Sequence, residues 1–267
     1  MVDALKCNLV LESGRPRLFF EGKELADLSV VIPRIGARIT SHGLAVVRQL
    51  EAQGVPLVNG ASAIAKSRDK LRSLQLLAAE GVPIPRTVLA RGSVDVELLL
   101  EQVGGLPAIL KLIQGTQGVG VMIAHSRAEV ASFLSTLWDL GQEILLQEFI
   151  AESKGRDVRA LVVGDRVVAA MRREARAGEF RSNIHRGGAG VPIQLEPGFA
   201  EAAVRAAQVL GLDVAGVDLL ESASGPKVME VNSSPGFEGL EKATGLDIAS
   251  AIVAHAAKKA LPSRAAG

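Results

Sequence analysis

The chain has 267 residues, of which 48% are apolar and 22% charged, and 30 Lys and Arg against 29 Asp and Glu leave a formal net charge of +1. This balance, without a concentrated basic block and with only 3% aromatic residues, argues against direct binding of nucleic acid. The single cysteine, Cys7, excludes an internal disulfide and fits a reducing compartment. No apolar run reaches the roughly 18 residues of a membrane span, and no signal peptide is recognisable. We therefore expect a cytoplasmic enzyme or small-molecule binder.

The first part of the chain alternates predicted strands and helices. Residues 29–35 and 55–59 are short apolar runs typical of buried strands. Between them, Leu44, Val47 and Leu50 recur at helical spacing, so a helix is expected there up to Gly54, giving a strand–helix–strand unit. A second helix is predicted between residues 67 and 80, where it ends before Gly81.

The remaining pattern predicts helices interleaved with β-hairpins. The predicted strands are 107–113, 119–125, 143–150, 157–163, 166–173, 215–222 and 226–232. Three further helices are expected: one begins at the capping box Ser126–Glu129, one spans residues 199–210, and one follows Asp247. This arrangement favours α+β lobes around a cleft over one doubly wound sheet.

A glycine-containing loop follows Lys111 and carries Gly115, Thr116 and Gly118. Glycines let main-chain N–H groups approach phosphate oxygens, and the threonine hydroxyl adds a donor. The loop is not a P-loop, because no Gly-Lys-Ser/Thr ends it, and it lacks the dinucleotide-binding spacing. We interpret it either as a hairpin loop over a triphosphate, with Lys111 reaching in, or as a tight turn beside a surface lysine.

Two acids and an amide form a second candidate set. Glu230 and Asn232 lie two residues apart on a predicted strand and share a face, and Asp218 lies on the partner strand of the same hairpin. Carboxylate and amide oxygens suit Mg²⁺, which also binds substrate phosphates. The alternative is a solvated polar face, but both acids lie in strongly apolar strands, where an unpaired acid is costly. The pattern therefore favours a metal site.

The segment FRSNIHRGG, residues 180–188, is the third candidate set. Its two arginines suit a carboxylate or an acyl phosphate, since arginine binds such groups through two parallel hydrogen bonds. The alternative is a flexible polar loop. His185 has no evident partner and is given no catalytic role, and no nucleophile motif accompanies it.

With these three sets in this order, the chain resembles the ATP-grasp superfamily and, within it, the RimK-type α-L-glutamate ligases. The segments that carry the resemblance are 31–36, 67–78, 111–121, 145–150, 157–170, 180–190, 215–220 and 228–249. The resemblance implies an α+β ATP-grasp fold, two α+β lobes gripping ATP, after a shortened N-terminal α/β pre-ATP-grasp domain, because family members begin with a strand and a helix ahead of the segment matching Met1. The expected domains are the pre-ATP-grasp domain at 1–65, the small lobe with its linking helix at 66–150, and the large lobe with the metal site at 151–267.

The resemblance also implies roles for individual residues. The implied nucleotide-binding residues are Lys70, Lys111, Gly115, Thr116, Gly118, Gln147, Glu148, Phe149, Ile150, Asp157, Arg181, Ser182 and Asn183. Among them, the lysines would contact the phosphates, residues 147–150 would form the hinge strand against adenine, and Asp157 would meet the ribose. Arg181 and Asn183 would be catalytic, Arg159 and Arg186 would bind substrate, and Asp218, Glu230 and Asn232 would hold two Mg²⁺ ions, with Mn²⁺ as a substitute.

The implied activity is ATP-dependent addition of L-glutamate, through an acyl phosphate, to the C-terminal glutamate of the sixth small-subunit ribosomal protein, or to a growing poly-α-glutamate. The expected partners are therefore L-glutamate and a peptide or protein acceptor, in a homo-oligomer that binds neither nucleic acid nor membrane. Two alternatives stay open: a related ligase that joins glutamate or another amino acid to a small molecule or carrier protein, as in lysine biosynthesis, and a nucleotide-binding regulator without turnover. The intact acid and amide set argues against the regulator.

Overall fold

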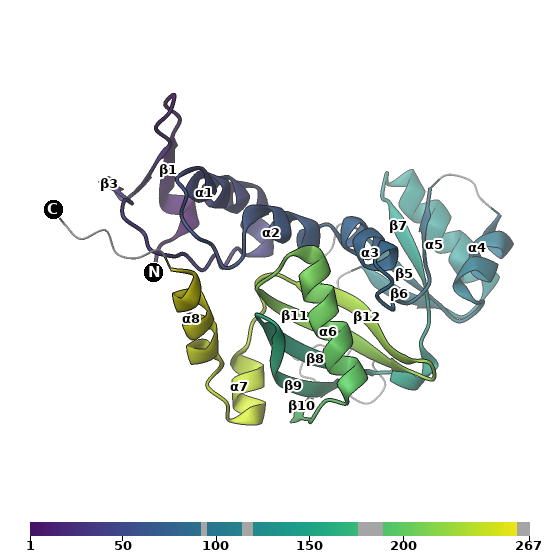
Figure 1. Cartoon of the computed structure of the whole chain (residues 1–267). Coiled ribbons are helices and arrows are strands. Elements are labelled where there is room, and N and C mark those ends of the chain that lie inside the picture. The colour runs from purple at the N-terminus through teal and green to yellow at the C-terminus, as the bar shows by residue number, and fades with distance from the viewer. Residues whose placement is uncertain (92–94, 114–119, 176–188, 261–267) are drawn as a thin grey trace.

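The computed structural model describes residues 1–91, 95–113, 120–175 and 189–260, which form three antiparallel sheets along the chain (Figure 1). One sheet lies in each of the ranges expected as domains, 1–65, 66–150 and 151–267, although the boundaries themselves stay predictions. Among the described helices, none has the length and apolar character needed to cross a membrane.

The N-terminal part combines a small sheet with two helices. Its elements are η1 (Ala4–Lys6), β1 (Cys7–Val10), β2 (Arg17–Phe20), β3 (Lys23–Glu24), η2 (Ala37–Ile39), α1 (Thr40–Ala52) and α2 (Ala61–Arg68). The helix expected around Leu44 is confirmed as α1, whose apolar side packs against the sheet and α2. The buried Gln49 of α1 donates to the carbonyls of Val10 and Arg17 at 3.2 and 3.0 Å, which ties the helix to β1 and β2.

The prediction of strands at 29–35 and 55–59 is wrong. These runs meet only in one isolated parallel bridge, Val31 with Leu57, held by two main-chain hydrogen bonds of 2.9 Å. Pro33 and Pro56 lack N–H donors, so the ladder has no donors at those positions with which to extend. The expected strand–helix–strand unit is therefore two extended segments with one bridge beside α1.

The middle of the chain forms a four-stranded sheet in the order β4-β7-β5-β6, with helices packed on one face. Its elements are α3 (Lys70–Ala79), β4 (Thr87–Ala90), α4 (Val96–Val103), β5 (Ala108–Leu112), β6 (Val121–Ala124), α5 (Arg127–Asp139) and β7 (Ile144–Glu148). The helix expected between residues 67 and 80 begins only at Lys70, because Asp69 ends α2 and accepts from the Arg72 N–H as the N-cap of α3. The predicted cap of α5 is confirmed, since Ser126 accepts from the Glu129 N–H.

The C-terminal part is a five-stranded sheet in the order β10-β9-β8-β11-β12, with α6 across one face (Figure 1). Its elements are η3 (Ala151–Ser153), β8 (Arg156–Val163), β9 (Arg166–Glu174), β10 (Ala189–Pro192), α6 (Pro197–Leu210), β11 (Val214–Ser222), β12 (Gly225–Asn232), α7 (Glu238–Thr244) and α8 (Ile248–Lys259). Both predicted hairpins, the helix ending before Gly211 and the Asp247 cap of α8 are confirmed. Helices α7 and α8 cover one part of the other face.

Alternation along the strands explains where the charged side chains of this sheet lie. Val158, Ala160 and Val217 belong to the apolar cluster under α6. Because side chains alternate between faces, their neighbours Arg159 and Asp218 lie on the opposite face. The sheet therefore presents Arg159 and Asp218 on the side away from α6.

Candidate functional site

The two predicted metal-binding acids lie directly across from each other. Asp218 of β11 and Glu230 of β12 are paired positions in the ladder, and Asn232 pairs with Gly216 one step along the same face. Paired positions of adjacent strands hold their Cβ atoms about 4.5–5.5 Å apart, so the two carboxylates are immediate neighbours. The predicted shared face of Asp218, Glu230 and Asn232 is thus confirmed, while their role as metal ligands stays a prediction.

Asp218 lies in a buried network with two arginines. Arg159, opposite Asp218 on β8, donates from Nε and Nη2 to the two carboxylate oxygens at 2.6 Å each. Arg173 of β9 lies 3.0 Å from Asp218 Oδ2 and also binds Asp157 through distances of 2.5 and 2.8 Å. Burial disfavours ionisation of Asp218, but Arg159 and Arg173 outweigh it and hold the pKa of the carboxyl below its usual value.

The same network places two other predicted residues. Asp157, expected at the ribose, is only 4% exposed and bonded to Arg173, and Arg159, expected to bind substrate, directs its guanidinium at Asp218. Burial lowers the pKa of Arg173, but Asp218 and Asp157 raise it by more than burial lowers it. The net pKa is above the usual value, so the guanidinium stays charged. The structure therefore shows both residues in buried ion pairs, and their roles toward ligands stay predictions.

Glu230 lies among cations from β5 of the middle sheet and from the helices α2 and α3. Lys70 at the start of α3 and Lys111 of β5 act on it electrostatically, as does Arg68 at the end of α2. Lys70 Nζ also donates to the Leu112 carbonyl at 3.2 Å, which connects α3 to β5. The structure thus brings the two predicted phosphate-binding lysines to the predicted metal-binding acid.

Titration in this group reflects partial burial and opposed charges. Desolvation raises the pKa of Glu230, and the adjacent Asp218 carboxylate raises it further, while Lys111, Lys70 and Arg159 act in the opposite direction. Desolvation also lowers the pKa of Lys111 to about 8, and the effects of Glu230 and Lys70 on it oppose each other. Because the Glu230 residue is exposed to solvent, ions and ligands can reach it.

The donor set fits a magnesium ion that shares its coordination with a substrate. Within the described ranges, no three His, Cys, Asp or Glu side chains gather into a metal site. Two carboxylates and an amide are nevertheless sufficient for Mg²⁺, which is commonly bound by one or two protein carboxylates, substrate phosphates and water. The repulsion between Asp218 and Glu230 is the feature that a bound cation would relieve.

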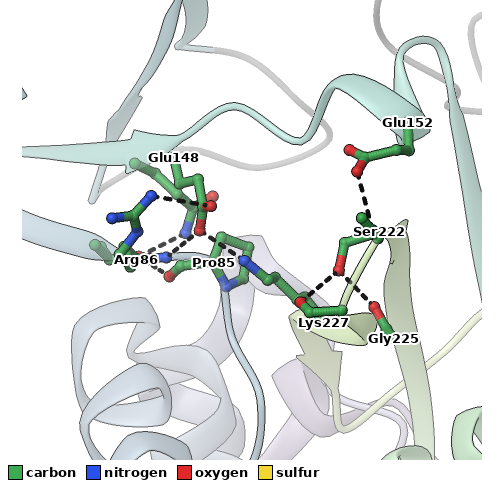
Figure 2. A network of polar contacts seen from close by, with 11 residues as sticks. Pro85, Arg86, Glu148, Glu152, Ser222, Gly225 and Lys227 are labelled. Carbon is green, nitrogen blue, oxygen red and sulfur yellow. Dashed lines mark hydrogen bonds and ion pairs between the residues drawn. The ribbon is translucent and has the colours of Figure 1, made fainter. Parts of the chain in front are cut away.

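The predicted hinge strand, 147–150, begins with the last two residues of β7, and the side chains of both already form polar contacts. Gln147 is 2% exposed and donates to Thr87 Oγ1 at 2.8 Å. Glu148 is bonded to Arg86 and Lys227 (Figure 2). Phe149 and Ile150 follow directly, with Ile150 buried. A base lying against this segment would therefore meet main-chain groups rather than free polar side chains.

Seven predicted site residues lie outside the described residues. Gly115, Thr116 and Gly118 belong to 114–119, and Arg181, Ser182, Asn183 and Arg186 belong to 176–188. Their roles stay predictions.

Three charged residues of the site were missed by the sequence interpretation: Arg68, Arg173 and Lys227. Arg173 was missed although it lies in a predicted hairpin opposite Asp157. The alternation of side chains along β9 would have indicated that either Arg172 or Arg173 lies on the same face as Asp157. The register that selects between them depends on a β-bulge. Arg68 and Lys227 reach the site only through the tertiary arrangement of α2 and β12.

Comparisons with known proteins agree over most of the chain. Residues 67–256 match the family model described as RimK-like ATP-grasp domain, and residues 1–64 match that described as RimK PreATP-grasp domain. A protein of Rhodopirellula baltica named "Probable alpha-L-glutamate ligase" is 52% identical over 253 residues, 95% of this chain and 62% of that protein. One of the same name from Aliivibrio fischeri is 49% identical over 264 residues, 99% of this chain and 88% of that protein.

Solved structures share the fold at low sequence identity. The ATP-grasp ligase PsnB, complexed with a phosphomimetic variant of its minimal precursor, Mg and ADP, has a TM-score of 0.72 and 22% identity, with 95% of this chain and 85% of that chain covered. D-alanine–D-alanine ligase from Bacillus anthracis has a TM-score of 0.68 and 19% identity, with 87% and 81% covered. These findings confirm the fold class and the family resemblance predicted from the three residue sets. The chain therefore belongs to the RimK-like ATP-grasp family of ATP-dependent ligases.

Proposed function

We propose that this chain adds L-glutamate to the C-terminal carboxylate of an acceptor that ends in glutamate, with ATP and Mg²⁺ as cofactors. The acceptor is the C-terminus of the sixth small-subunit ribosomal protein, or a growing poly-α-glutamate chain. The observation that carries the proposal is the convergence of Lys70 and Lys111 on the Asp218–Glu230 pair. The name of the relatives, "Probable alpha-L-glutamate ligase", supports glutamate as the amino acid.

The proposed reaction has two steps. In the first, an oxygen of the acceptor carboxylate attacks the γ-phosphorus of ATP, an acyl phosphate forms and ADP leaves. In the second, the amino group of L-glutamate attacks the acyl carbon, the amide bond forms, inorganic phosphate leaves, and the amine proton passes to solvent. The tetrahedral intermediate of the second step carries an oxyanion, for which the resemblance assigns Arg181 as a donor.

The described residues support these steps through charge. Lys70 and Lys111 offer ammonium groups to the phosphate oxygens, whose charge spreads during phosphoryl transfer. Asp218, Glu230 and Asn232 are the residues that would hold Mg²⁺, which when bound neutralises phosphate charge. PsnB, a fold neighbour solved in complex with a minimal precursor, Mg and ADP and also with a precursor peptide, supports a peptide acceptor for this fold.

The test is ADP release measured against a panel of amino acids, combined with mass spectrometry of the acceptor. We expect release to need L-glutamate, to increase with a peptide that ends in glutamate, and to add mass in glutamate steps. D-glutamate and L-lysine should substitute poorly, because a misplaced or missing carboxylate leaves an arginine without its partner. A slow glutamate polymer should form without any peptide.

Three outcomes would redirect the proposal. ADP release as strong with lysine or with a carrier protein as with glutamate would favour the biosynthetic ligase instead. ATP binding without ADP release in any mixture would favour a regulator. Activity with glutamate-ended peptides but not with the ribosomal protein would keep the chemistry and reject that acceptor. The expected homo-oligomer and cytoplasmic location stay predictions alongside these.

A further inference from the structure

The chain that leaves the middle sheet is fastened to the β11–β12 hairpin through Glu148, Glu152 and Ser153. At the end of β7, Glu148 Oε2 lies 2.8 Å from Lys227 Nζ of β12 (Figure 2). Five residues later, in η3, Ser153 Oγ accepts from the Glu221 N–H at 2.6 Å and donates to its carbonyl at 3.0 Å. The segment 148–153, which includes the predicted hinge, is thus held against the C-terminal sheet.

Lys227 is the less exposed of the two cations that bind the Glu148 carboxylate. The side chains of Lys227 and Glu148 are each 17% exposed, whereas Arg86, whose Nη2 lies 3.3 Å from Glu148 Oε1, is 57% exposed. An exposed pair contributes little, so the Lys227 contact is the stronger restraint. Burial raises the pKa of Glu148, but the hydrogen bond from Lys227 leads the contributions that lower it below its usual value.

Main-chain hydrogen bonds extend the same junction. The Glu148 N–H donates to the Arg86 carbonyl, and the Arg86 N–H donates back to Glu148 Oε2 at 3.0 Å. The Val228 N–H, next to Lys227, donates to the Pro83 carbonyl at 2.7 Å. The chain entering the middle sheet and the chain leaving it therefore both meet β12 at residues 227 and 228.

The same strand also carries Glu230, three residues beyond Lys227. Three residues of strand span about 10 Å, so one short, continuous segment connects the hinge to the acid among the phosphate-binding lysines. We propose that Lys227 is a positioning residue for the nucleotide: it holds Glu148 so that the main chain at 148–150 keeps its place relative to Glu230. An adenine at the hinge and phosphates at Glu230 can then be held at the same time. This inference rests on the proposed use of ATP.

The test separates the base from the phosphates. In calorimetric titrations of the full chain, Lys227→Met should weaken ATP binding about tenfold. This is the smallest loss of affinity expected when one partner of a desolvated ion pair is removed. Binding of inorganic tripolyphosphate should be unchanged, because it makes no use of the hinge. Preference for ATP over GTP should fall. Lys227→Arg should restore most of the ATP affinity, since it keeps a cation opposite Glu148.

A matched control is Lys259→Met, which removes a lysine 2.7 Å from Asp213, on α8 rather than at the hinge. It should leave both affinities unchanged. If Lys227→Met does not fold, as judged by thermal melting, Glu148→Gln removes the charge from the other side of the pair and should reproduce the selective loss.

Two results would overturn the inference: wild-type ATP affinity in a folded Lys227→Met protein, or an equal loss of ATP and tripolyphosphate, which indicates general loosening. Failure of the proposed function is distinguishable, because the wild-type chain would then not bind ATP at all, or would bind it without releasing ADP.

Discussion

Replacing Arg173 by methionine is the sharpest test of how the site is built. The Arg173 side chain is 6% exposed and binds Asp157 at 2.5 and 2.8 Å and Asp218 at 3.0 Å. Removing one partner of a buried ion pair typically costs about 3–5 kcal/mol, because the remaining charge stays desolvated. At roughly 2–4 °C per kcal/mol for a protein of this size, the melting temperature should fall by about 6–20 °C.

The pH dependence of the melting temperature provides a second test of this prediction. Because the pKa of Asp218 is depressed in the folded chain, its contribution to stability is present above the unfolded pKa of about 3.9 and is lost as pH falls through the folded value. The difference in melting temperature between Arg173→Met and wild type should therefore be largest near neutral pH and shrink below about pH 4. Calorimetric melting across this range measures both effects.

The control is Arg205→Met, which breaks an exposed pair with Glu80, with side chains 54% and 55% exposed. It should cost less than about 1 kcal/mol. If Arg173→Met melts within about 2 °C of wild type at neutral pH, the three-residue network does not stabilise the sheet and the reasoning fails.

Three further predictions concern the acid, the lysine and the packing beside them. Glu230→Gln should reduce ADP release about 100-fold or more without lowering the melting temperature, because it removes charge that the proposed metal needs, and wild-type turnover in the folded variant would reject the metal assignment. Lys111, with a pKa of about 8, is charged below that pH and neutral above it, so the ATP affinity measured by calorimetry should fall as pH rises through 8. Lys111→Arg should flatten this pH profile. A wild-type ATP affinity that does not change between about pH 7 and pH 9 would refute the prediction. Gly216→Ala should destabilise the chain by about 1–3 kcal/mol in denaturant titrations, because its Cβ would lie 2.7 Å from Pro235 Cβ, whereas Gly198→Ala, with no atom within 4 Å, should not.

Local patterns were sufficient for the hairpins and most helices. The Gly164-Asp165 turn between two apolar runs predicted β8 and β9, and the caps Ser126 and Asp247 predicted the starts of α5 and α8. These features depend on residues near one another in sequence, so the sequence carries the information directly. The ATP-grasp motifs likewise identified the family, because their order and spacing are specific.

Features that depend on distant partners were not predictable in this way. The small sheet β1–β3 has strands of two to four residues with no clear alternation, and it is stabilised by packing against α1. The predicted strands at 29–35 and 55–59 have apolar composition but prolines at positions where a ladder needs donors. Composition alone could not distinguish a buried extended segment from a strand.

By itself, the sequence determined that Asp218, Glu230 and Asn232 lie on neighbouring strands and that Lys70 and Lys111 precede them in a family-specific order. Tertiary structure decided which side chains face the site. From the turn, a regular β8–β9 register would place Arg172 opposite Asp157, but a bulge between Leu161 and Val162 shifts the pairing to Arg173.

The β11–β12 hairpin shows the same effect. Ser222 pairs with Gly225, which in regular register would set Asp218 against Met229 and put Glu230 on the other face; a bulge after Asp218 brings Glu230 opposite instead. The reason is that side chains alternate with a period of two, so a shift of one residue exchanges the two faces of a strand. Such a bulge is a property of two paired strands, so the alternation within either strand does not reveal it.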